Sequence, residues 1–335
     1  MDNIDLLVRV DADETVGLAH VVRTRKLIDT LHADINLTIF GKDHSLLKGY
    51  FPEAGFFGDQ NTCYQNQNFD AVLCDCTIKG DIFWRQMIER DKLSLIVIDD
   101  YGGSVPADLI INGTVIEAYH QYSGLAECGK VLCGPEYALV DLCFRATKWN
   151  QSSTSNTLTI VIGSGERAKQ WAYKLVQGPM CWELFDTINM IVGNAFPEIE
   201  VLKNVARSKK VVFQQGITAR ELAAQLSNSS VALITGGMIL YEAMAVGVPT
   251  IVFPQETNLL KEAQWFEDAE CVINLGYTGG MDIDVINSAL CTLVSNKPLA
   301  KRLSNRGRLI IDGQGLKRVA SAIDEILNKC RRNCS

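Results

Sequence analysis

Short apolar runs rich in β-branched residues recur along the 335-residue chain, separated by longer segments whose apolar positions have helical spacing. Such runs are typical of strands buried on both faces, and the segments between them predict covering helices. The expected strands are Asp5–Val10, Asn36–Phe40, Ala71–Cys74, Leu93–Ile98, Leu109–Ile111, Leu158–Ile162, Thr187–Val192, Lys210–Gln214, Val231–Thr235, Thr250–Phe253 and Glu270–Asn274. The expected helices include Ala19–Leu31, Arg167–Gln177, Ala219–Ser227, Ile239–Val246 and Ala263–Glu267. This alternation predicts an α/β fold with parallel sheets.

A polar stretch rich in Ser and Asn, residues 150–156, interrupts the pattern near the middle of the chain. Its composition is typical of a linker. We therefore expect one Rossmann-like domain in residues 1–149 and a second in residues 157–335. Two such domains facing each other would place a ligand cleft at the carboxyl ends of both sheets.

Composition and charge narrow the class of protein. The chain is 47% hydrophobic and 21% charged, close to soluble globular averages, and its formal charge of −7 argues against binding to nucleic acid. No uncharged run reaches the roughly 18–20 residues that span a bilayer, and the acidic start lacks the positive region of a secretion signal. The eleven cysteines are scattered through apolar stretches and suggest reduced thiols. We expect a cytoplasmic monomer or weak dimer without stable membrane insertion.

The turn after the first predicted strand carries the strongest candidate for acid–base chemistry. His20 falls in the first turn of a predicted helix at the carboxyl end of that strand. The positive end of a helix disfavours imidazolium, and a neutral imidazole is what a general base needs. Asp11 or Asp13 could orient the ring. The alternative is a histidine that makes only structural hydrogen bonds near the helix cap.

Asp11 and Asp13 also form a D-x-D, the motif that holds a metal–nucleotide complex in one class of glycosyltransferases. In that class the motif lies well inside the chain, after the nucleotide-binding strands, whereas here it lies close to residue 10. We therefore expect no metal and no other cofactor.

A second candidate site follows a predicted strand in the other half of the chain. Two glycines there would let a diphosphate approach the backbone, and the next helix would supply N–H groups and a positive dipole. A glutamate one turn further along could accept hydrogen bonds from both ribose hydroxyls. Another glycine-rich turn follows the first strand of this half. The predicted nucleotide-binding residues are Gly163, Gly236, Gly237, Met238 and Glu242.

Taken in order, these motifs resemble those of the UDP-sugar hydrolases of pseudaminic acid biosynthesis and of the related spore-coat polysaccharide proteins. The resemblance covers nearly the whole chain, and the ordered set is far more specific than any single motif. Its blocks are Arg9-x-Asp11, Gly17-x-x-His20-x-x-Arg23, Asp75, Trp84, Ile98-Asp99-Asp100, Ile111-Asn112, Gly134 to Leu139, Gly236-Gly237 with Tyr241-Glu242, Gly247-x-Pro249, and Asp312 to Gly315 with Arg318.

The resemblance implies a two-domain GT-B fold, a UDP-sugar substrate, no metal and water as the acceptor. It assigns catalysis to His20, with Asp11 beside it, and UDP binding to the second glycine turn. The residues expected to bind substrate are Arg9, Gly17, Arg23, Asp75, Tyr137 and Asn258. The chain departs from the family near phosphate and sugar, where Ala19, Met238, Ile239 and Leu259 replace Gly, Ser, Thr and Gln.

We therefore expect a nucleotide-sugar hydrolase that releases UDP and a free modified hexose, in nonulosonic acid or surface polysaccharide biosynthesis. A GT-B glycosyltransferase, in which an acceptor hydroxyl replaces water, is the first alternative. A non-catalytic nucleotide-sugar binding protein is the second, favoured by the departures from the family's phosphate-binding and sugar-binding residues.

Overall fold

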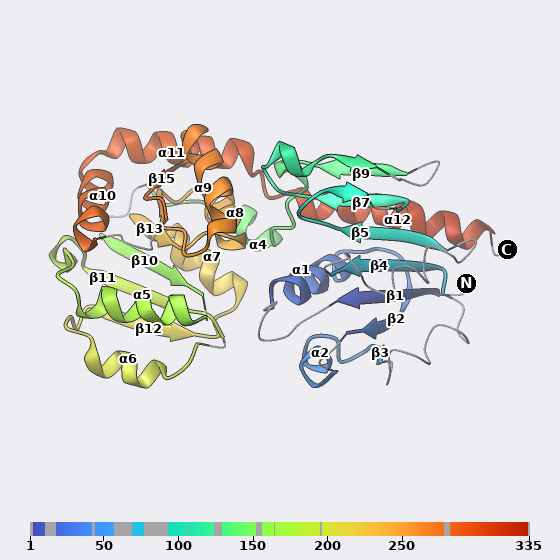
Figure 1. The fold of residues 1–335 in the computed structure, drawn as a ribbon, viewed down its shortest axis with the longest axis horizontal. Coiled ribbons are helices and arrows are strands. Elements are labelled where there is room, and N and C mark those ends of the chain that lie inside the picture. The colour runs from blue at the N-terminus through green and yellow to red at the C-terminus, as the bar shows by residue number, and fades with distance from the viewer. Residues whose placement is uncertain are drawn as a thin grey trace. The chain divides into compact units, whose positions relative to one another are not determined.

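The protein forms two compact units, each built on one parallel sheet. One unit comprises residues 1–139 together with 314–335, and the other comprises residues 140–313. In the computed structural model, helices cover the sheet of each unit (Figure 1). The structure describes residues 3–10, 18–41, 44–56, 69–76, 93–104, 106–123, 129–151, 156–163, 165–194, 196–277 and 282–333.

The first unit contains a seven-stranded parallel sheet with the order β3-β2-β1-β4-β5-β7-β9. Its strands are β1 (Ile4–Val10), β2 (Ile35–Phe40), β3 (Gly55–Phe56), β4 (Ala71–Asp75), β5 (Ser94–Ile98), β7 (Leu109–Asn112) and β9 (Lys130–Cys133), and β6 (Gly103–Ser104) and β8 (Tyr122–Ser123) form a separate pair. Its helical elements are α1 (Ala19–Ile28), α2 (His44–Tyr50), η1 (Glu117–Tyr119), η2 (Pro135–Tyr137) and α12 (Gly315–Asn333). The central strands are almost entirely buried because helices cover the sheet, as the continuous apolar runs predict.

The second unit contains a six-stranded parallel sheet with the order β12-β11-β10-β13-β14-β15. Its strands are β10 (Thr157–Ile162), β11 (Thr187–Val192), β12 (Val211–Gln215), β13 (Val231–Ile234), β14 (Thr250–Val252) and β15 (Val272–Asn274). Its helical elements are α4 (Leu142–Ala146), α5 (Glu166–Gln177), η3 (Trp182–Leu184), α6 (Ile199–Val205), α7 (Ala219–Ser227), α8 (Met238–Val246), η4 (Thr257–Leu259), α9 (Leu260–Asp268), α10 (Ile283–Ser295) and α11 (Lys297–Ile310). The strand order reverses direction beside β10, where doubly wound sheets bind ligands.

The units differ from the expected domains at both boundaries. The predicted linker begins at Asn150, but the chain already belongs to the second unit from Val140. There the Trp149 indole donates to the Ser229 carbonyl at 2.8 Å, and the Asn150 amide donates to the Ser227 carbonyl at 2.8 Å. A polar composition therefore did not mark the point at which the chain passes between units.

The other difference is α12, which belongs to the first unit although the second domain was expected to run to residue 335. This 19-residue helix packs against α1, β1 and β5 and follows the sheet of the first unit (Figure 1). It buries Val319, Ile323 and Leu327 on one face and exposes polar residues on the other. No helix in the described part of the chain is long and apolar enough to cross a membrane.

Candidate functional site

The carboxyl edge of the first sheet brings together side chains from α1 and the end of β4. Val10 pairs with Asp75 across β1 and β4, so Asp75 lies beside the loop that leads into α1. On α1, His20, Arg23 and Thr24 have the i, i+3, i+4 spacing that places side chains on one face of a helix. All three contact the Asp75 carboxylate.

The Asp75 carboxylate is completely buried and accepts hydrogen bonds on both oxygens. Oδ1 lies 2.6 Å from His20 Nδ1 and 2.6 Å from Arg23 Nη2. Oδ2 accepts from Arg23 Nε at 2.8 Å and from the Thr24 hydroxyl at 2.8 Å. Arg23 also donates from Nη1 to Asp100 Oδ1 at 2.9 Å, just beyond the end of β5. One arginine therefore joins the ends of two neighbouring strands.

The electrostatics of this cluster keep Asp75 ionised. Burial alone would raise the pKa of Asp75, but the Arg23 charge and the hydrogen bonds from Arg23 and His20 outweigh it and hold that pKa well below its ordinary value. Burial alone would likewise lower the pKa of Arg23, but Asp100 and Asp75 raise it well above the ordinary value. The buried charges are thus paired, as buried charges must be.

This arrangement selects the form of the His20 ring. A contact of 2.6 Å between Nδ1 and an ionised carboxylate requires a proton on Nδ1. Arg23 Nη2, 3.1 Å from the same nitrogen, is then a neighbouring donor and not a hydrogen-bond partner. Nε2 has no hydrogen-bond partner among the described residues, and the side chain is 22% exposed. A carboxylate-bound imidazole with a free second nitrogen can accept a proton.

Asp75, which was expected to bind substrate, instead contacts His20 Nδ1 in this structure. It is inaccessible, and both its oxygens accept hydrogen bonds from neighbouring side chains, so its expected contact with substrate stays a prediction. Asp11, Asp13 and Gly17 lie outside the described residues, so the expected roles of Asp11 and Gly17 stay predictions. Arg23 was also expected to bind substrate, which stays a prediction; its guanidinium forms ion pairs with Asp75 and Asp100.

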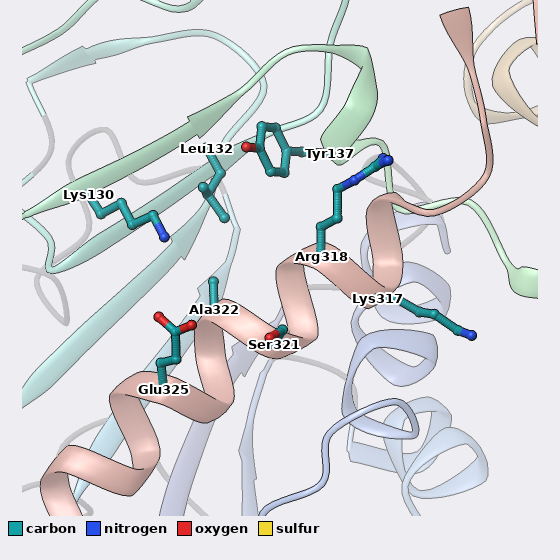
Figure 2. A pocket seen from close by; sticks show the side chains of 8 residues that line it. All are labelled: Lys130, Leu132, Tyr137, Lys317, Arg318, Ser321, Ala322 and Glu325. Carbon is teal, nitrogen blue, oxygen red and sulfur yellow. The ribbon is translucent and has the colours of Figure 1, made fainter. Parts of the chain in front are cut away.

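The remaining residues expected to bind substrate are Arg9, Tyr137 and Asn258. Arg9 is 4% exposed, and its guanidinium lies 4.8 Å from the centre of the Phe40 ring. Tyr137 lines a groove between η2, β9 and α12 (Figure 2). The side chain of Asn258 lies outside the described residues.

The end of β5 and the end of β7 are joined by a second polar cluster beside Asp100. The Tyr122 hydroxyl donates to Asp99 Oδ2 at 2.7 Å and accepts from Asn112 Nδ2 at 2.8 Å. The backbone amide of Gly102 also donates to Asp99 Oδ2, at 2.6 Å. The Asp99 and Asn112 blocks of the sequence therefore fix the loops at this edge of the sheet.

In the second unit, the predicted glycine turn follows β13 and opens α8. Gly236 and Gly237 have φ angles of +93° and +79°, which a residue with a side chain rarely adopts. Gly237 is the N-cap of α8, and no side chain of the described residues caps this end of the helix. Met238 begins α8, and the half-buried Glu242 follows one turn later. Gly163 directly follows β10 at the same edge of the sheet, and an added Cβ there would meet no atom of the described residues within 4 Å.

Sequence inspection missed two polar residues at this edge. Arg167, in the first turn of α5, donates from Nη1 to the Gln255 carbonyl at 2.6 Å. Gln255 follows β14, is only 6% exposed, and has a buried Nε2 with no partner among the described residues. An unsatisfied buried donor is costly and calls for an acceptor. Both Arg167 and Gln255 come shortly after predicted strands, and this position in the sequence could have identified them as candidate binding residues.

Leu259 covers the glycine turn of the second unit. A Cβ at Gly236 would lie 3.5 Å from Leu259 Cβ, and one at Gly237 would lie 3.9 Å from Leu259 Cδ2. The replacement of a family glutamine by Leu259 therefore places an apolar side chain against the turn.

Metal ligands are not gathered in the parts of the chain that the structure describes. Within those ranges, no group of three or more His, Cys, Asp or Glu side chains is arranged to hold a metal ion. Asp11 and Asp13 fall outside them, so the expectation of a metal-independent site stays a prediction.

Comparison with solved structures defines the fold class. The chain shares its fold with the calicheamicin glycosyltransferase CalG4, with a TM-score of 0.63, 14% identity and coverage of 98% of this chain and 99% of that one. It also shares its fold with UDP-GlcNAc 2-epimerase from Neisseria meningitidis bound to UDP-GlcNAc, with a TM-score of 0.60, 12% identity and coverage of 97% and 100%. The predicted α/β class with two Rossmann-like units of the GT-B type is confirmed.

The sequence adds a more specific relationship. The chain is homologous to the spore coat polysaccharide biosynthesis protein SpsG of Bacillus subtilis, with 22% identity over 326 residues that cover 92% of this chain and 95% of SpsG. No family model matches the chain.

Proposed function

We propose that the protein is a nucleotide-sugar hydrolase of surface polysaccharide or nonulosonic acid biosynthesis, releasing UDP and a free modified hexose. The observation that carries the proposal is the pairing of His20 with the buried, ionised Asp75, which leaves Nε2 to act as a base. Homology to SpsG supports the polysaccharide context. A structural neighbour that carries UDP-GlcNAc supports the class of substrate.

In the proposed reaction, His20 Nε2 takes a proton from water as the water oxygen attacks the anomeric carbon. The bond between that carbon and the diphosphate oxygen breaks, and UDP leaves with the electron pair. Asp75 stabilises the imidazolium that forms, because its negative charge lies against Nδ1. General-base catalysis of this kind contributes about 100- to 10,000-fold in rate.

The second unit would hold UDP at the turn between β13 and α8. Backbone N–H groups at an uncapped helix end suit a diphosphate, and Gly236 and Gly237 let it approach closely. The same groups would stabilise the charge that develops on the leaving diphosphate. Glu242 would accept hydrogen bonds from the ribose.

We expect Glu242→Ala to weaken UDP binding by roughly tenfold or more. The substitution leaves the ribose hydroxyls without a charged acceptor, and such hydrogen bonds contribute about 1.5–3 kcal/mol. Calorimetric titration with UDP measures the change. Glu200→Ala is a matched control, because Glu200 is an exposed glutamate of the helix α6 in the same unit. Equal UDP affinity in Glu242→Ala and Glu200→Ala would place the ribose elsewhere.

The experiment that tests the proposed activity is incubation with UDP-, GDP- and CMP-sugars in buffer without an acceptor, scored for free nucleotide. Release of UDP from one UDP-sugar is the expected result. The fold shared with CalG4, a glycosyltransferase, favours one second candidate, transfer to a hydroxyl of an acceptor. Release of nucleotide only after an acceptor is added would identify that activity. No release with any donor or acceptor would indicate a binding protein.

A further inference from the structure

A groove in the first unit lies at the β9 edge of the sheet, whereas the His20 cluster joins α1 to the end of β4. It has a volume of about 420 Å³ and lies between β9, η2 and α12. β9 is the edge strand, and β5 and β7 separate it from β4. Its lining residues are Lys130, Leu132, Tyr137, Lys317, Arg318, Ser321, Ala322 and Glu325 (Figure 2).

Local packing explains why the groove exists. Gly315 begins α12 so close to η2 that an added Cβ would lie 2.2 Å from the Ala138 carbonyl oxygen. Beyond this close approach, α12 presents the short side chains of Ser321 and Ala322 toward the edge strand. The hollow is therefore fixed by the backbone and by small residues, and its volume is within the range of small-molecule sites.

The groove is positively charged in a chain whose net charge is −7. Two lysines and one arginine line it, against the single carboxylate of Glu325. Among the described residues, neither Lys130 nor Lys317 has a carboxylate within ion-pair distance. Such a local excess of positive charge attracts anions.

The positions of the polar groups along the groove suit a small ligand that carries one anionic group at one end. Figure 2 shows Tyr137 and Arg318 close together at one end, and Lys130 and Glu325 at the other. Lys317 points outward, and Leu132 faces Ala322 between the two ends (Figure 2). The Arg318 guanidinium is anchored, because Nη1 donates to the Glu136 carbonyl at 2.8 Å.

We propose that this groove binds a phosphate monoester of a small hydroxylated molecule, such as a sugar phosphate. The phosphoryl group would bind the Arg318 guanidinium. The Tyr137 hydroxyl, which faces Leu132 in Figure 2, and the Ser321 hydroxyl would contact the hydroxylated part of the ligand. Guanidinium–phosphate contacts are among the stronger hydrogen bonds in proteins. The body of the ligand would lie over Leu132 and Ala322. This site is independent of the proposed hydrolase activity.

Glucose 1-phosphate is a suitable probe, followed by its ³¹P resonance as protein is added. We expect saturable binding of glucose 1-phosphate and, by calorimetric titration, no binding of glucose, which has no phosphate. Arg318→Gln should weaken binding about tenfold or more, because a charged donor is lost. Since this change also removes the bond to Glu136, Ser321→Glu provides a second variant that leaves Arg318 in place and adds a carboxylate to the groove. It should weaken binding by a similar factor.

Asn328→Glu is the matched control, because it adds the same charge to an exposed position of α12 two turns from Ser321 and outside the groove. It should bind glucose 1-phosphate as the unmodified protein does. Equal affinity in Ser321→Glu and Asn328→Glu would overturn the proposal, as would the absence of saturation. Binding of a heparin oligosaccharide without binding of glucose 1-phosphate would also overturn it and assign the groove to a polymeric anion.

Discussion

Replacement of His20 by alanine is expected to lower the rate of UDP release about 100- to 10,000-fold, the usual effect of losing a general base. UDP affinity should stay nearly unchanged, because the proposed nucleotide site lies in the other unit, at Gly236 and Gly237. Steady-state turnover of the identified UDP-sugar and calorimetric titration with UDP measure the two quantities separately.

His32→Ala is the matched control, because His32 is an exposed histidine of the same unit whose backbone N–H contacts Asp324. It should retain the activity of the unmodified protein. His20→Ala should unfold cooperatively, because Asp75 keeps its bonds to Arg23 and Thr24. Retention of more than about a tenth of the activity by His20→Ala would contradict the assignment of the base.

Replacement of Asp75 by asparagine should affect both catalysis and stability. The neutral amide no longer stabilises imidazolium or fixes the proton on Nδ1, and loss of the equivalent carboxylate in serine proteases costs about 10,000-fold. We expect a loss of at least about 100-fold in turnover, with UDP affinity unchanged. Arg23 would lose one of its two carboxylates, and breaking a buried ion pair costs about 3–5 kcal/mol of unfolding free energy.

Asp100→Asn separates the two effects. Asp100 is the other partner of Arg23, its side chain is 30% exposed, and among the described residues no hydrogen bond joins it to His20. It should lower stability less than Asp75→Asn and leave most of the turnover intact. A similar loss of turnover in both variants, in proportion to their loss of stability, would mean that Asp75 has only a structural role.

The pH dependence of stability follows from the depressed pKa of Asp75. Because the folded-state pKa lies below the unfolded value of about 3.9, the contribution of Asp75 is fully present above that value and is lost as the pH falls through the folded pKa. The difference in unfolding free energy between the unmodified protein and Asp75→Asn should therefore be constant from about pH 5 to 8 and shrink in more acidic solution. Urea unfolding at a series of pH values measures it.

The pattern of apolar residues was sufficient to locate the principal strands of both sheets, because strands that are buried on both faces have continuous apolar sequences. It missed β9, a four-residue edge strand that begins with the exposed Lys130. It also could not assign α12 to the first unit, because the buried face of an amphipathic helix does not reveal which sheet it covers.

Part of the candidate site could also be predicted from the positions of residues relative to the strands. His20 and the glycine turn stand directly after strands, where parallel sheets collect ligand-binding groups. The partner of His20 lies 55 residues further along the chain, at the end of the adjacent strand β4. Only the strand order shows that Asp75, so far along the chain, reaches the His20 ring.

The central claim is that water attacks the anomeric carbon of a UDP-sugar with His20 as the base. Its most direct test is the reaction in ¹⁸O-labelled water containing EDTA and no acceptor, with both products analysed by mass spectrometry. The account predicts UDP without label and a free sugar with ¹⁸O at the anomeric position. Label on the UDP phosphate would show cleavage of the phosphorus–oxygen bond and contradict the account.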